Sequence, residues 1–101
     1  MAAGASAAPQ SDRQQREVFY AGRVQGVGFR YTVRSLAARF DVTGFVRNLP
    51  DGRVHLVVEG DVAEIEKFVE AIRAEMRYYI GNVQETVRPE SGRFPSFEIR
   101  H

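Results

Sequence analysis

The stretch Gly22-Arg23-Val24-Gln25-Gly26-Val27-Gly28-Phe29-Arg30 lies between an extended apolar run and a helical pattern. Its three glycines let the backbone adopt positive φ angles and turn successive N–H groups toward one concavity. The helix that begins just beyond adds the positive end of its dipole, and Arg30 adds a guanidinium that can donate two hydrogen bonds to a tetrahedral oxyanion. The stretch therefore predicts a phosphate-binding loop. The alternative is a strand-to-helix turn whose glycines only relieve crowding.

Patterns on both sides of this loop predict the first half of the fold. Residues 18–24 alternate as a strand, and residues 29–40 carry an apolar stripe at helical spacing. Residues 43–49 and 53–59 are predicted strands, joined by a tight hairpin turn at residues 49–52. In the second of these strands, the valines and leucine at even positions are expected to face inward. His55 and Glu59 are expected to face solvent.

The second half of the chain adds a helix and two strands. Asp61, with Glu64 three residues later, has the spacing of a helix-capping box, and an apolar stripe follows. Residues 82–88 predict a fourth strand, and residues 97–99 a short fifth. This order predicts an α+β, ferredoxin-like βαββαβ sandwich, with two helices packed on one face of a mainly antiparallel four- to five-stranded sheet. The other face is expected to be left largely to solvent.

Asn48 is the unusual residue of the predicted hairpin. It shares the inward parity of Gly44 and Val46, yet it is polar and lies just before the turn. A buried amide there needs hydrogen-bonding partners. The alternative is an asparagine that satisfies backbone groups of the turn.

Composition excludes several classes of function. The chain has 101 residues, 44% of them hydrophobic, which suits one domain; we expect a disordered tail over residues 1–16 and the domain over residues 17–101. A net charge of +1 provides no general field for nucleic acid or anionic lipid. There are no cysteines and only two histidines, which argues against a metal site. No stretch reaches the roughly 18 apolar residues of a membrane span, so we expect a soluble protein. The missing cysteines are compatible with the cytosol, and we expect a cytoplasmic monomer.

The two motifs together, GRVQGVGFR at residues 22–30 and GFVRNLPDGRVHLVVEG at residues 44–60, resemble the acylphosphatase family, and the resemblance extends over residues 18–99. It implies the ferredoxin-like fold, hydrolysis of a small-molecule acyl phosphate to a carboxylate and inorganic phosphate, and no cofactor. By this resemblance Arg30 binds the phosphoryl group and Asn48 positions the attacking water. The loop residues expected to hold phosphate are Gln25, Gly26, Val27, Gly28, Phe29 and Arg30.

Two rival functions share this fold. A non-catalytic module could hold an acyl or carbamoyl phosphate for a larger enzyme, although the free-standing length argues against it. An RNA-binding domain would carry stacking aromatics on the central strands of its exposed sheet face. Here that face offers Phe19 on the first strand but Arg53, His55 and Val57 on the third, so we expect no nucleic-acid partner.

Overall fold

A computed structural model describes residues 12–101. Residues 1–11, which make up most of the expected tail, lie outside the described residues. Within the described part of the chain, no helix is long and apolar enough to cross a membrane. The elements follow in the order β1 (Arg13–Gly22), α2 (Phe29–Ala37), β2 (Val42–Asn48), β3 (Val54–Asp61), α3 (Val62–Met76), β4 (Ile80–Arg88) and β5 (Phe97–Arg100).

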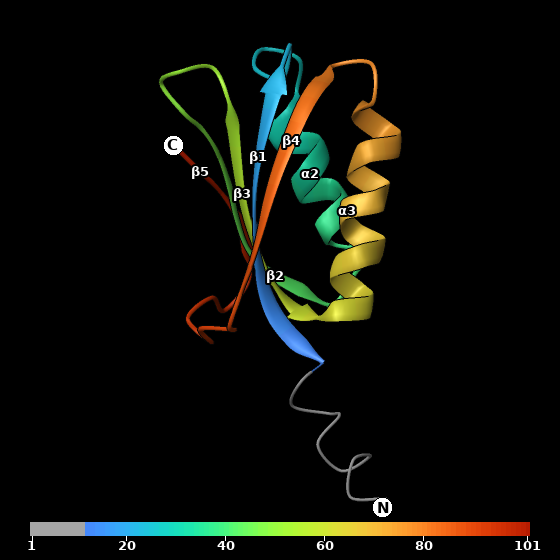
Figure 1. Cartoon of the computed structure of the whole chain (residues 1–101), viewed down its shortest axis with the longest axis vertical. Helices are drawn as coiled ribbons and strands as arrows, with labels where there is room; N and C mark the ends of the chain where they lie inside the picture. The colour runs from blue at the N-terminus through green and yellow to red at the C-terminus, as the bar shows by residue number, and fades with distance from the viewer. Residues whose placement is uncertain (1–11) are drawn as a thin grey trace, which may run out of the picture.

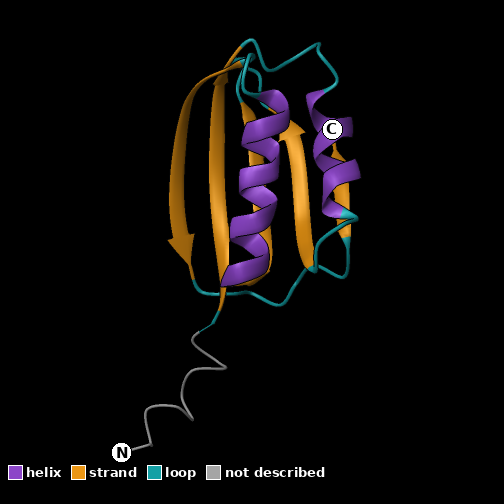
Figure 2. Cartoon of the chain, turned by 90° about the vertical axis from the view of Figure 1, so that its right-hand side faces the viewer, coloured by secondary structure: helices purple, strands orange, loops and turns teal. Residues whose placement is uncertain are grey.

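The five strands form one sheet in the order β4-β1-β3-β2-β5. Every neighbouring pair is antiparallel except β2 and β5, which are parallel. Both helices lie side by side on one face of the sheet (Figure 1 and Figure 2). The predicted βαββαβ sandwich is therefore confirmed. Because β1 and β2 run in the same direction on either side of β3, the loop after β1 and the end of β2 come to the same end of the sheet.

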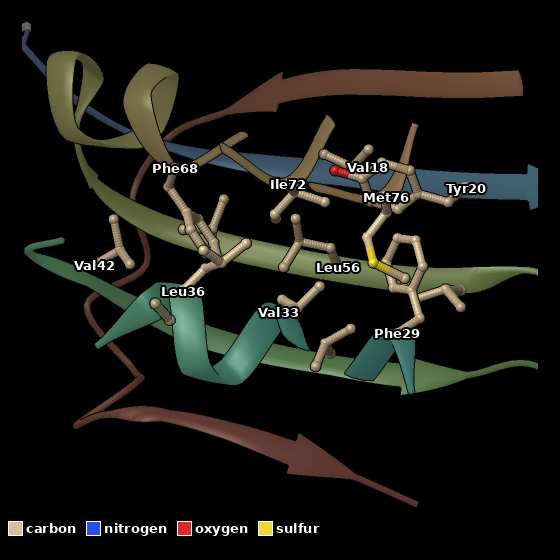
Figure 3. Close-up of a cluster of buried hydrophobic side chains, with 14 of the residues drawn as sticks. Val18, Tyr20, Phe29, Val33, Leu36, Val42, Leu56, Phe68, Ile72 and Met76 are labelled. Carbon is tan, nitrogen blue, oxygen red and sulfur yellow. The ribbon is translucent and has the colours of Figure 1, made fainter. Parts of the chain in front are cut away.

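The hydrophobic core fills the space between the sheet and the helices. Val18 and Tyr20 of β1 and Leu56 of β3 cluster with Phe68 and Ile72 of α3 (Figure 3). Burying a side chain of this size contributes about 1.5–3 kcal/mol to the free energy of unfolding. These positions carry the alternating and helical apolar patterns of the sequence, so the pattern and the core agree.

The first strand begins earlier than expected. It starts at Arg13 rather than at residue 18, so residues 13–16 pair with β3 instead of belonging to the tail. The guanidinium of Arg16 is buried, with Nη2 3.0 Å from a carboxylate oxygen of Glu66 and Nη1 3.9 Å from one of Glu85. A polar run can therefore form a strand here because α3 and β4 supply the opposite charges.

The second face of the sheet is covered along β3, which corrects the expectation for His55. Only 6% of this residue is exposed, and its ring stacks on Phe19 with centroids 4.5 Å apart. Its Nε2 lies 2.8 Å from Oε2 of Glu17. Hydrogen bonds from Arg88 and His55 lower the pKa of Glu17 below its ordinary value.

Glu59 is the second residue whose expected exposure is wrong, since only 1% of it is exposed. Its carboxylate accepts hydrogen bonds from Gln15 Nε2 at 2.6 Å, from N and Oγ of Ser91 at 2.9 and 2.7 Å, and from Gly92 N at 3.0 Å. The connection between β4 and β5 thus folds back over this face. Alternation along β3 cannot reveal that cover, because it comes from a segment about thirty residues further along the chain.

The start of α3 also differs from the expectation. Asp61 occupies the N-cap position but makes no side-chain capping bond. Glu64 accepts a hydrogen bond from the backbone N–H of Asp41 at 2.8 Å. The predicted capping box is therefore wrong, because a tertiary contact takes the Glu64 carboxylate.

Candidate active site

The glycine loop joins β1 to α2 at one end of the sheet. Gly26 and Gly28 both have φ of 79°, the left-handed region that glycine adopts without strain. Gly28 is the N-cap of α2, which has no side-chain capping bond and no acidic residue in its first turn. The first N–H groups of a helix have no intrahelical partner, so this end of α2 can donate to an anion.

Two contacts fix the position of the loop. Gly22 has φ of 128°, and a Cβ atom there would lie 2.5 Å from the backbone of both Tyr79 and Gly81, so only glycine fits. The Nε2 of Gln25 donates to the carbonyl oxygens of Leu49 at 2.8 Å and Arg53 at 2.9 Å, on either side of the hairpin turn. Gln25 therefore ties the glycine loop to the hairpin that carries Asn48.

A pocket of about 160 Å³ forms where the loop, the start of α2 and the end of β2 meet. It brings Arg30 and Asn48 together, although they lie on separate elements. Its lining residues are Val24, Gly26, Gly28, Phe29, Arg30, Tyr31 and Asn48.

Arg30 is the cation of this pocket. It is half-buried, and no carboxylate of residues 12–101 forms an ion pair with it. Its Nη1 lies 3.3 Å from the backbone oxygen of Arg100 and 3.1 Å from Nδ1 of His101. These contacts orient the guanidinium but leave its charge uncompensated, and a half-buried charge of this kind favours an anionic ligand.

Asn48 supplies the polar oxygen of the pocket. Its Oδ1 is buried and accepts no hydrogen bond from the described residues. A buried acceptor without a partner costs about 1–3 kcal/mol, so its presence at a pocket wall needs an explanation. A ligand or water in the pocket can provide the missing donor.

Five of the site residues expected from the sequence line the pocket. Gly26, Gly28, Phe29, Arg30 and Asn48 lie together around the pocket. Gln25 and Val27 do not line it, because the Gln25 side chain is bound to the hairpin and Val27 points toward solvent.

Two lining residues were missed. Val24 was assigned to the first strand but follows it, and its side chain is fully buried. Tyr31 lies off the apolar stripe of α2, and 59% of it is exposed. An aromatic residue outside the stripe and next to the loop arginine was the one available signal.

The lining residues include no carboxyl, imidazole or thiol group. The pocket can therefore bind an anion and position a polar molecule, but its described side chains provide no general base of ordinary strength. A larger hollow of about 620 Å³, lined by Asp12, Asp61, Val62 and Ala63, lies at the other end of β3 and presents carboxylates instead. Anion chemistry thus belongs to the smaller pocket.

Comparisons with known proteins agree on one family. Residues 16–99 match the family model described as Acylphosphatase. An acylphosphatase of Archaeoglobus fulgidus is 35% identical over 85 residues, which cover 84% of this chain and 96% of that one. The crystal structure of acylphosphatase from Bacillus subtilis superposes with a TM-score of 0.80 and 32% identity, covering 87% of this chain and 99% of that one.

A larger protein contains a similar unit. The crystal structure of full-length HypF in the phosphate- and nucleotide-bound form matches with a TM-score of 0.68 and 27% identity. The match covers 88% of this chain but 12% of that one.

Proposed function

Because this chain belongs to the acylphosphatase family and is an enzyme that hydrolyses acyl phosphates, we propose that Arg30 and Asn48 divide the catalytic work between them. One observation carries the assignment. An arginine without a carboxylate partner among residues 12–101 and a buried amide oxygen without a donor in the same part of the chain face one pocket of about 160 Å³.

Arg30 binds the phosphoryl group in this proposal. Its planar guanidinium can bridge two phosphoryl oxygens, and the contacts to Arg100 and His101 restrict its orientation. Backbone N–H groups of residues 25–30, in the glycine loop and at the start of α2, hold the remaining oxygens. In the transition state the charge on these oxygens is stabilised by donors that are already in place.

Asn48 orients the attacking water. Its Oδ1, which has no donor among the described residues, accepts a hydrogen bond from the water and holds it beside the phosphorus atom, in line with the leaving carboxylate. An amide is not basic enough to remove the proton, so the amide acts by position alone.

The reaction balances without a general acid or base from the protein. The water oxygen forms a bond to phosphorus, and the bond between phosphorus and the acyl oxygen breaks. The carboxylate leaves with the electron pair and is stable without protonation, while the water proton passes to a phosphoryl oxygen. The products are a carboxylate and inorganic phosphate, and no cofactor is required.

The rival is a module that holds acyl or carbamoyl phosphate without hydrolysing it. The observation that supports this rival is the match to a small part of full-length HypF, because a similar unit there belongs to a larger protein. Turnover by the chain alone separates the two, because a holding module binds phosphate but releases no carboxylate.

We also propose that the enzyme works as a monomer in the cytoplasm. The described residues of a single chain bring Arg30 and Asn48 to one pocket. The absence of cysteines is compatible with a reducing compartment. Light scattering on the purified full chain should give the mass of one chain, and a stable dimer would contradict the proposal.

The test of the function is hydrolysis of acetyl phosphate by the purified full chain, followed by ³¹P NMR in the presence of excess EDTA. We expect inorganic phosphate to appear at a rate proportional to enzyme, and Arg30→Ala to abolish it. The matched control is Arg73→Ala, which removes a surface arginine of α3 that pairs with Glu70. Activity that disappears with EDTA and returns only with added metal would contradict the mechanism, and phosphate binding without turnover would favour the rival.

A further inference from the structure

A second hollow borders the phosphoryl pocket and has no role in the steps above. It is a groove of about 360 Å³ between α2 and α3, the two helices that lie side by side in Figure 2. Tyr31 lines both the groove and the phosphoryl pocket. We propose that this groove is the subsite for the acyl group of the substrate, and that Tyr31 is its specificity-determining residue. The inference rests on the proposed function of the pocket.

The two hollows differ in volume, and the difference indicates which part of the substrate each can hold. Pockets that enclose a whole small molecule usually measure about 300–1,000 Å³, so a pocket of about 160 Å³ suits a phosphoryl group and the water beside it. The carbon chain that leaves with the carboxylate needs a further surface. The groove shares the wall of Tyr31 with the phosphoryl pocket, and it has more than twice the volume.

Tyr31 has the geometry of a platform. It follows Arg30 directly in α2 and lines the pocket, and 59% of it is exposed, so it is not part of the core. The guanidinium of Arg34 lies 6.0 Å from the ring centroid. An exposed aromatic ring beside a polar site stacks well against a planar apolar group.

The remaining walls define the class of acyl group. Leu36 and the ring of Tyr31 are apolar, Thr32 and Ser35 present hydroxyl groups, and Arg39 and Glu75 carry opposite charges. These walls balance in charge and offer one aromatic surface. The groove therefore favours a planar or aromatic acyl group over acetyl, which has a single methyl group and cannot reach across it.

The experiment compares benzoyl phosphate with acetyl phosphate, because both release a carboxylate of similar basicity but only the first carries a ring. We expect Tyr31→Ala to lower the ratio of kcat/KM for benzoyl phosphate to kcat/KM for acetyl phosphate about five- to tenfold, mainly through a higher KM for benzoyl phosphate. Tyr31→Phe keeps the ring and should keep the ratio within about twofold of wild type. Competitive inhibition by benzoylphosphonate, relative to acetylphosphonate, should change in parallel.

The matched control is Tyr78→Ala, which removes a tyrosine that is 80% exposed and lines neither hollow. An equal loss for both substrates in Tyr31→Ala, or the same change in ratio in Tyr78→Ala, would overturn the subsite. An unchanged ratio in Tyr31→Ala would do so as well. In each of these cases hydrolysis of acetyl phosphate by the wild-type enzyme still supports the proposed function. A wild-type enzyme that hydrolyses neither substrate would overturn the proposed function itself.

Discussion

Two buried polar side chains at opposite ends of the sheet differ in whether the described residues donate hydrogen bonds to them. At one end, Oδ1 of Asn48 accepts no hydrogen bond from the described residues, and Arg30 nearby has no carboxylate partner among them. At the other end, the carboxylate of Glu59 accepts hydrogen bonds from Gln15, Ser91 and Gly92. Both groups are desolvated, but only one of them is satisfied by the protein itself.

This difference separates stability from function. A buried carboxylate with several donors holds the segment between β4 and β5 against β3, and its removal is expected to loosen the fold. A buried amide without a donor gives no such support, so its removal is expected to affect only what enters the pocket. The number of internal hydrogen bonds at each end thus predicts which property a mutation changes.

Arg30→Lys should have the largest effect at the open end. It keeps the positive charge but replaces a planar fork with a flexible point charge. We expect turnover of acetyl phosphate to fall by about 10²-fold or more, with weaker inhibition by inorganic phosphate and a nearly unchanged melting temperature. Steady-state kinetics and thermal unfolding measure both properties. Near-normal kinetics in the folded variant would mean that charge and backbone N–H groups suffice.

Asn48→Ala should lower turnover by about 10²-fold, because one preorganised hydrogen-bonding group is lost. The inhibition constant of inorganic phosphate should stay within about threefold of wild type, since Arg30 and the loop remain. The free energy of unfolding should not fall, because the Oδ1 atom has no hydrogen bond within residues 12–101 to lose. If phosphate affinity collapsed while turnover persisted, Asn48 would be a phosphate-binding residue, and its proposed role in orienting water would be wrong.

Glu59→Gln should show the reverse pattern. One carboxylate oxygen becomes an NH₂ group that faces other donors, so we expect the free energy of unfolding to fall by about 2 kcal/mol in denaturant titrations. The kcat/KM at 25 °C should stay within about twofold of wild type. Glu70→Gln is the control, since this exposed carboxylate pairs with Arg73 one turn along α3 and should change stability by less than about 0.5 kcal/mol. A clear fall in kcat/KM of the folded Glu59→Gln protein would show that the two ends of the sheet are coupled and would contradict this expectation.

The smallest expected effect is on the pH dependence of stability, which again tests the role of Glu59. Burial by itself raises the pKa of Glu59, but the hydrogen bonds from Ser91, Gln15 and Gly92 outweigh it and lower the pKa below its ordinary value. A lowered pKa in the folded state gives stability that is present above the ordinary pKa and is lost as the pH falls through the folded value. Wild type should therefore lose stability below about pH 5, and Glu59→Gln should lose less. Glu17, whose pKa is also lowered, contributes in the same way to the pH dependence of stability in both proteins.

Local patterns were enough to predict most of the fold and to single out residues that the structure brings around one pocket. The apolar stripe beginning at Phe29 and the alternation through Leu56 identify core positions, because periodicity in sequence becomes one face of a helix or strand. The glycines of the loop, Arg30 and Asn48 were found by the same local reasoning. The structure brings them around one pocket because β1 and β2 point to the same end of the sheet.

Tertiary structure alone decided the features that depend on contacts distant in sequence. Glu59 and His55 have the alternation of exposed residues, yet a loop and aromatic neighbours from other strands bury them. Residues 13–16 look like a polar tail, yet Glu66 and Glu85 compensate Arg16 and make them a strand. Whether Tyr31 borders a groove depends on where α3 lies. A sequence states the polarity of each side chain, but burial and hydrogen bonding depend on which distant segment folds against it.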